Sequence, residues 1–157
     1  MSGLRERLAA KARRQLVVPI LVSDASTDQH TFNGAMVALQ LAQAREDPQP
    51  GEVENLTKAV QDAAEAVKAH YVDVHMQALT AADWEAAMAK WTGDTVDWAA
   101  ALPPLLAESC VDEELQDEQW WRERLGDESW TEGDIDALRR ALLLLNVSAA
   151  DPSVPKG

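Results

Sequence analysis

Residues 80–146 read TAADWEAAMAKWTGDTVDWAAALPPLLAESCVDEELQDEQWWRERLGDESWTEGDIDALRRALLLLN, and this stretch decides the fold class of the chain. All six tryptophans lie here, on short segments with helical spacing that Gly and Pro residues separate. Thr80 with Asp83, and Thr131 with Asp134, have the spacing of capping boxes, so we expect helices to begin after each threonine. The stretch therefore predicts a series of short helices with acidic side chains between the tryptophans.

Apolar side chains recur at helical spacing along these expected helices. In the first, Trp84, Met88 and Trp91 share a face, and Gly93 ends the helix. A short helix over 94–101 follows, and Trp98 is expected in the core together with Trp84 and Trp91. Pro103–Pro104 is expected to break this helix. A helix over 112–125 has acidic residues near its N-terminus, where the helix dipole favours them. In the last, over 132–146, one face carries Ile135, Leu138, Leu142 and Leu145.

Upstream, residues 52–78 have the spacing of one long helix, set off from a helix over 31–46 by the break DPQPG. Thr31 is the expected cap of the 31–46 helix. Along residues 52–78, apolar residues recur at alternating spacings of three and four residues, as in the seam of a coiled coil. His70 occupies one position of this seam. This seam either packs in an antiparallel hairpin within the chain or forms a self-association interface; its main residues are Val53, Leu56, Val60, Val67 and Val74.

The first 30 residues combine a basic helix with an apolar arm. Residues 4–14 (LRERLAAKARR) are basic and predict a helix that covers acidic surface of its own chain or of a neighbour, in preference to RNA or membrane. Residues 15–22 (QLVVPILV) are β-branched and predict a strand or an extended arm. Pro19 restricts a strand here to a sheet edge, and we expect no second strand of comparable strength. Residues 23–30 are expected to form a polar turn.

Composition narrows the class of partner. The chain has 157 residues and a net charge of −13, so it is repelled by phosphate backbones and anionic lipid. We therefore expect neither nucleic acid nor membrane as a partner. Cys110 is the single cysteine, which excludes an internal disulfide and indicates a cytosolic protein. No secretory leader or membrane-spanning segment is expected.

No motif of catalysis or cofactor binding is found in the sequence. His70 and His75 are five residues apart and do not share a helix face, and the carboxylates lack the spacing of a calcium loop. Cys110 has no histidine nearby in sequence and is expected in the core. We expect no enzyme activity, no metal and no cofactor.

The strongest local prediction of a binding patch concerns the last three tryptophans. Trp120 and Trp121 are adjacent, so on one helix their side chains point about 100° apart and only one can face the core. The other is expected to be partly exposed, together with Trp130 in the following loop. Because tryptophan is enriched at interface hot spots, the three residues predict a partner-binding patch.

These observations predict a mostly α, multi-helix single domain over residues 1–147, with a short extended or β arm near residues 15–22. Its parts are a basic helix plus arm (1–30), a helical hairpin (31–78) and a tryptophan-rich acidic helical part (80–147). Residues 148–157 are expected to form a disordered tail.

Three phrases of the chain resemble a known family. LTAADWEAAMAKW (79–91), DWAAALPPLLAESCVDEEL (97–115) and SWTEGDIDALRRALLLLN (129–146) are similar to segments of the tail assembly chaperones of long-tailed bacteriophages and prophages. The resemblance covers roughly residues 75–147. It implies a small, acidic, helical and non-enzymatic protein that coats the tape measure protein and recruits tail tube subunits. It further implies a place in the cytoplasm of the bacterial host and absence from the mature virion.

Two other classes of function stay open from the sequence. One is a structural head–tail connector or completion protein that remains in a phage particle. The other is a helical regulator or antitoxin that uses the basic N-terminus on nucleic acid. The family has no catalytic motif, so the resemblance assigns no functional residue.

Overall fold

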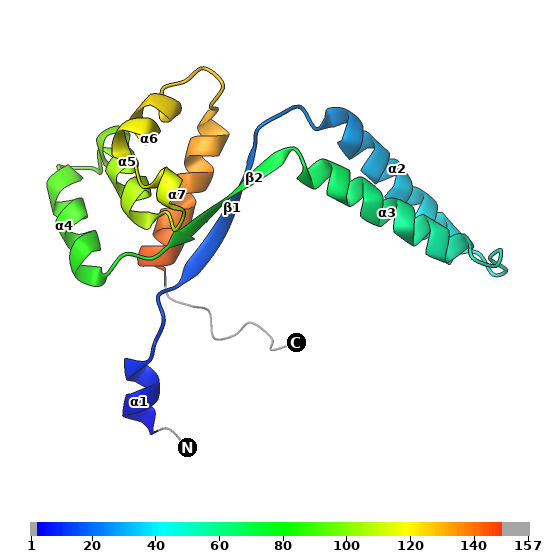
Figure 1. Cartoon of the computed structure of the whole chain (residues 1–157), viewed down its shortest axis with the longest axis horizontal. Coiled ribbons are helices and arrows are strands. Elements are labelled where there is room, and N and C mark those ends of the chain that lie inside the picture. Colours follow the sequence, from blue (N-terminus) through cyan, green and yellow to red (C-terminus); the bar gives the residue numbers. More distant parts are fainter. Residues whose placement is uncertain (1–2, 149–157) are drawn as a thin grey trace. The chain divides into compact units, whose positions relative to one another are not determined.

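The computed structural model describes residues 3–148 and is mostly helical, with one small antiparallel sheet (Figure 1). This confirms the predicted mostly α fold with a short β segment near residues 15–22. The elements are, in chain order, α1 (Leu4–Ala9), β1 (Gln15–Leu21), α2 (Ser26–Gln43), α3 (Glu52–Lys68), β2 (Tyr71–Gln77), α4 (Ala81–Trp91), α5 (Trp98–Ser109), the 3-10 helix η1 (Glu113–Leu115), α6 (Glu118–Leu125) and α7 (Glu132–Asn146).

The residues group into two compact units, where the sequence led us to expect a single domain. The hairpin unit comprises residues 19–73, and the core unit comprises residues 3–18 and 74–148 of the described part. The boundaries fall within β1 and β2.

The sheet pairs β1 with β2 in an antiparallel register. Val22 N donates to the carbonyl of His70, and Ala78 N donates to the carbonyl of Arg14, which places Val18 opposite Val74. Both valines are buried. In this register the backbone N of Pro19 faces away from β2, so its missing N–H removes no hydrogen bond from the ladder.

Strand β2 corrects the prediction of one helix over 52–78. Helix α3 ends at Lys68, and residues 71–77 (YVDVHMQ) are extended. The valines and methionine of this segment alternate with polar residues, so Val74 and Met76 are buried on one face while His75 is exposed. Pairing with β1 stabilises the extended form, and the seam spacing through Val74 is coincidental.

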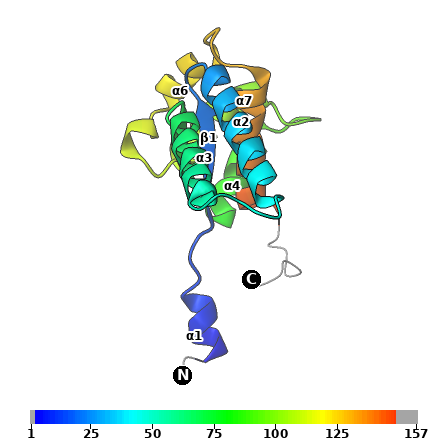
Figure 2. The same ribbon diagram turned by 90° about the vertical axis from the view of Figure 1, so that its right-hand side faces the viewer.

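In the hairpin unit, α2 and α3 lie side by side (Figure 2). Helix α2 begins at Ser26, not at 31, because Asp24 accepts a hydrogen bond from Ser26 N and opens the first turn. Thr31 lies inside this helix and donates to the carbonyl of Thr27, so its predicted capping role is wrong. Gly51 precedes α3 with a φ of 76°, a left-handed conformation that glycine adopts without steric cost.

The core unit is built around α5 and α7. Most of α5 is apolar and half of its residues are buried, and α7 contributes the stripe Leu138, Ala141, Leu142 and Leu145. Strand β2 adds Met76, which pairs with Cys110 in an isolated antiparallel bridge. The expected apolar face of the last helix is thus confirmed as core, except that Ile135 is only half-buried.

Pro103 and Pro104 lie inside α5, which corrects the predicted helix break. The helix instead begins at Trp98, where the Asp97 side chain accepts a hydrogen bond from Ala100 N. Each proline removes one helical hydrogen bond at a cost of about 3 kcal/mol. Burial of Leu102, Leu105 and Leu106, at about 1.5–3 kcal/mol each, offsets that cost.

Side-chain caps begin α4, η1, α6 and α7. Thr80 accepts from Asp83 N at α4, and at α7 Thr131 and Asp134 form the complete predicted capping box. The expected helix over 112–125 is divided into η1 and α6, and Asp117 caps α6 by accepting from Trp120 N. Helix α1 is shorter than the predicted 4–14, and most of the tail predicted at 148–157 lies outside the described residues. Within residues 3–148, no helix is both long and apolar enough to cross a bilayer.

Candidate functional site

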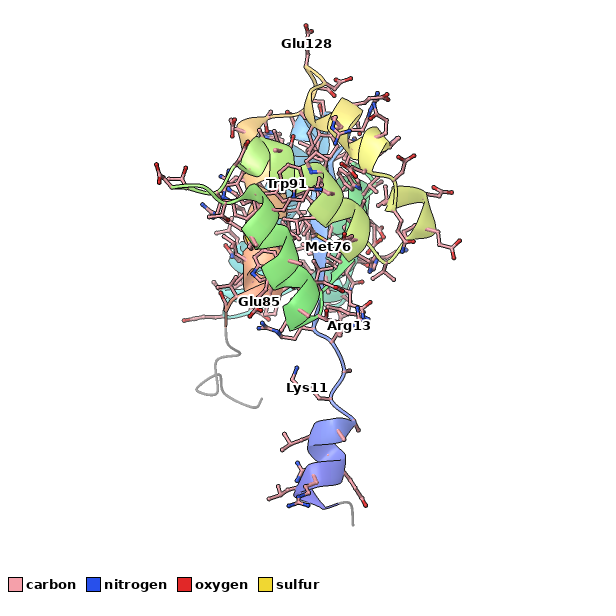
Figure 3. The ribbon with its side chains drawn as sticks, turned by 90° about the vertical axis from the view of Figure 1, so that its left-hand side faces the viewer. Lys11, Arg13, Met76, Glu85, Trp91 and Glu128 are labelled. Atoms are coloured by element: carbon pink, nitrogen blue, oxygen red, sulfur yellow. The ribbon has the colours of Figure 1, made fainter. Side chains whose placement is uncertain are left out.

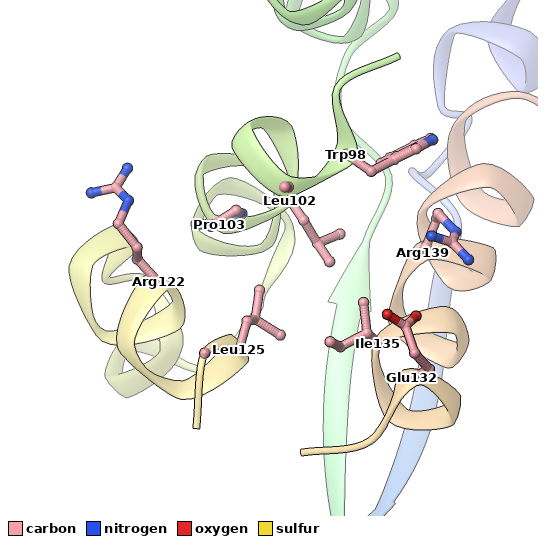
Figure 4. Close-up of a pocket in the computed structure, with 10 residues that line it drawn as sticks. Trp98, Leu102, Pro103, Arg122, Leu125, Glu132, Ile135 and Arg139 are labelled. Carbon is pink, nitrogen blue, oxygen red and sulfur yellow. The ribbon is translucent and has the colours of Figure 1, made fainter. Parts of the chain in front are cut away.

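A surface groove of about 370 Å³ lies between α5, α6 and α7 in the core unit (Figure 4). Its apolar lining comes from all three helices: Trp98, Leu102 and Pro103 of α5, Leu125 of α6 and Ile135 of α7. In Figure 4, the side chains of Leu102, Leu125 and Ile135 converge on the space between the helices. The groove can therefore accept an apolar side chain or a short apolar stretch of a partner.

Charged side chains border this apolar lining. Arg122 of α6 and Arg139 of α7 lie on opposite sides of the groove, with Glu132 on the α7 side (Figure 4). Each arginine is held by a carboxylate one turn earlier on its own helix, Arg122 by Glu118 and Arg139 by Asp136. Such intrahelical pairs at the surface are weak, so either guanidinium can exchange its partner for a carboxylate of a bound segment.

The three tryptophans of the predicted patch form one cluster. The ring of Trp121 meets the ring of Trp120 edge-on at 5.0 Å between centroids, and that of Trp130 at 6.2 Å. Trp121 is 1% exposed and its Nε1 donates to the carbonyl of Leu115, whereas Trp120 is 37% exposed. The expected division between a buried and a partly exposed tryptophan on α6 is confirmed. Partner binding at this cluster stays a prediction.

An aspartate turn positions Trp130 against the cluster. Hydrogen bonds from Ser129 N (2.8 Å) and Ser129 Oγ (2.7 Å) reach Asp127 and lower the pKa of that carboxyl group below its usual value. The carbonyl of Asp127 then accepts from Trp130 N. This local turn explains how a loop residue holds a fixed place beside Trp121.

The exposed tryptophan of the cluster, Trp120, and the groove use different faces of α6. Arg122 and Leu125 line the groove, and Trp120 lies about 200° around the helix from Arg122 by the 100° step of an α-helix. The sequence predicts the cluster but not the groove. The groove residues come from three segments whose proximity no local pattern indicates.

The predicted seam residues do not form one surface. Val53, Leu56, Val60 and Val67 lie half-buried along α3 in the hairpin unit, as the intrachain hairpin interpretation requires. Val74 lies on β2 and is buried in the core unit, so its assignment to the helical seam is wrong. Self-association through the four α3 residues stays untested.

His70 has a different place from the one predicted. It follows α3 in the turn to β2, with Nδ1 2.7 Å from Ser23 Oγ and Nε2 2.6 Å from Asp28 Oδ2. These are the residue types of a serine-hydrolase triad, but the ring nitrogens are used in the opposite sense, since Nε2 faces the serine in that triad. The three side chains tie the start of α2 to the α3–β2 turn within the hairpin unit.

Cys110 is buried, as expected, at the end of α5. Burial, and then the nearby charge of Asp112, raise the pKa of its thiol to about 12. The neutral thiol is a poor nucleophile at physiological pH. Within residues 3–148, no three His, Cys, Asp or Glu side chains are grouped closely enough to hold a metal ion.

Comparison of the chain with protein-family models, with characterised proteins and with solved structures gives no match.

Proposed function

We propose that this chain is a non-enzymatic tail assembly chaperone of a long-tailed phage or prophage. It binds the tape measure protein and recruits tail tube subunits while the tail is built. The observation that carries the proposal is the composition of the groove between α5, α6 and α7. Two of the three segments that resemble the family line this groove. Residues 97–115 contribute Trp98 and Leu102, and residues 129–146 contribute Ile135 and Arg139.

The chemistry of the groove suits this partner. A tape measure protein is expected to present long apolar helices, which need cover until the tube encloses them. Leu102, Leu125 and Ile135 provide an apolar floor for a side chain of such a helix, and Arg122 and Arg139 provide charge for its polar flanks. The net charge of −13 favours a dispersed complex once the helix is covered.

Co-expression with the tape measure protein of the same phage or prophage tests the proposal. The lysate is clarified, the tape measure protein is captured by an affinity tag, and the eluate is separated by size-exclusion chromatography. We expect this chain to keep the tape measure protein in solution and to elute with it. A tape measure protein that precipitates while this chain elutes free would contradict the proposal.

A pair of substitutions on α7 locates the contact. Ile135→Glu places a charge in the groove, and Leu144→Glu places the same charge on a side chain that is 54% exposed and outside the groove. We expect at least a tenfold loss of captured tape measure protein for Ile135→Glu and little change for Leu144→Glu. Thermal unfolding of both variants checks that each still folds.

Mass spectrometry of purified virions separates this proposal from a structural connector. A chaperone acts in the host cytoplasm and leaves before the particle is complete, so its peptides are expected to be absent. One copy or more per virion would favour the connector instead.

A further inference from the structure

Helix α1 carries an apolar face that no other part of residues 3–148 covers. All six of its residues are exposed, including Leu4 at 75% and Leu8 at 71%. These two leucines are four residues apart, so they lie on one face of the helix. An isolated helix of fewer than about 12 residues is only marginally stable in water, so α1 needs a surface to pack against.

The charge of this segment points to the kind of surface. Residues 3–14 hold five of the chain's 14 Lys and Arg residues but only one of its 27 Asp and Glu residues. Within residues 3–148, Arg5, Arg7, Lys11 and Arg13 form no ion pair. Lys11 and Arg13 project from the segment that joins α1 to β1, and Glu85 and Trp91 lie on α4 (Figure 3). The rest of the chain carries nearly all of its Asp and Glu residues, so its surface has the opposite charge to this basic helix.

A hollow between α4 and α5 has the matching chemistry. It measures about 250 Å³ and has an apolar lining of Ala86, Ala87, Trp91, Pro104 and Leu105. The two alanines allow the backbone of a docked helix to approach closely. Asp83 on α4 and Glu108 on α5 add exposed carboxylates that form no ion pair among the described residues. Lys90 also lines the hollow, but its ammonium group lies over the Trp91 ring, 4.8 Å from the centroid.

We propose that α1 of one copy docks into the α4–α5 hollow of a second copy. Leu4 and Leu8 enter the apolar lining, and Arg5 and Arg7 approach Asp83 and Glu108. The occupant is a second copy because the described part of a single chain leaves α1 uncovered, while every copy supplies an acidic hollow. Residues 11–14 join α1 to β1 without regular secondary structure. Exchange of such a terminal element between protomers is a low-cost route to association.

This contact is heterologous, since the arm and the hollow are different surfaces of the chain. Such contacts produce a dimer with exchanged arms, a closed ring, or an open chain of copies. The contact uses neither the groove between α5, α6 and α7 nor a tape measure protein. Its failure and the failure of the proposed function are therefore separate results.

Light scattering coupled to size-exclusion chromatography of the full chain tests the contact. At low salt the wild-type chain is expected at a multiple of its 17.2 kDa monomer mass, and at lower mass as salt rises. Leu4→Asp with Leu8→Asp is expected to give the monomer. The control Leu144→Asp, at an exposed leucine outside the hollow, is expected to keep the wild-type mass.

A charge exchange makes the test specific. Asp83→Lys with Glu108→Lys is expected to release monomers, and adding Arg5→Glu with Arg7→Glu in the same chain is expected to restore association. Circular dichroism confirms the fold of each variant. A wild-type chain that stays at 17.2 kDa at all concentrations, or association that survives both sets of substitutions, would overturn the proposal.

Discussion

At the scale of single residues, Ser109 stands out because its buried hydroxyl group has no hydrogen-bond partner among the described residues. An unsatisfied buried polar group costs about 1–3 kcal/mol. We predict that Ser109→Ala raises the free energy of unfolding in urea by about 1 kcal/mol. Ser129→Ala is the matched control, since it removes a hydroxyl that donates to Asp127, and it should not stabilise. A destabilised Ser109→Ala variant would show that the hydroxyl group is satisfied after all.

The reactivity of Cys110 follows from the same burial. Its pKa is raised to about 12, so at pH 8 the thiol stays protonated in the folded chain. We predict that a disulfide reagent such as DTNB labels Cys110 slowly in the native protein and at once in urea. The rate in native protein should track global unfolding, because the thiol is exposed only then. Rapid labelling without urea would contradict its placement in the core.

At the scale of elements, two threonines distinguish a capping role from an interior one. Thr131 Oγ1 accepts from Asp134 N at the start of α7, whereas Thr31 lies within α2. We predict that Thr131→Ala lowers the free energy of unfolding by about 1 kcal/mol. Thr31→Ala should be neutral or slightly stabilising, because alanine is the better helix former. A loss at Thr31 equal to that at Thr131 would favour a helix start near residue 31.

Local chemistry explains which elements could be predicted from the sequence. The starts of α4 and α7 follow from Thr80 and Thr131, whose hydrogen bonds reach only three residues ahead. Strand β2 was missed because Val74 continues the spacing of α3, and its partner β1 lies about 50 residues upstream. The continuation of α5 through Pro103 was missed because burial, a tertiary effect, outweighs the local penalty.

The candidate site divides in the same way. Adjacent tryptophans on one helix must diverge, so the contrast between Trp120 and Trp121 could be predicted from position alone. The groove could not, since Leu102, Leu125 and Ile135 meet only after three helices pack. The hydrogen bonds of His70 with Ser23 and Asp28 likewise join residues that are more than 40 positions apart in the sequence.

At the scale of the whole molecule, charge is distributed unequally along the chain. A basic N-terminal segment precedes a sequence that carries nearly all the acidic residues. We predict that removing residues 1–10 abolishes self-association but leaves capture of the tape measure protein intact, because the groove lies on α5, α6 and α7. Light scattering and affinity capture on the same preparation check both parts. Loss of capture as well would place the N-terminal helix in the partner contact.

Site-specific photo-crosslinking shows whether the groove between α5, α6 and α7 holds the tape measure protein. A benzophenone amino acid replaces Leu125 in the groove or, as the matched control, the exposed Leu144 on α7. After irradiation of cells that co-express both proteins, we predict a crosslink to the tape measure protein from position 125 and little from position 144. Equal crosslinking at both positions, or none at 125 in a complex that still co-purifies, would contradict the account.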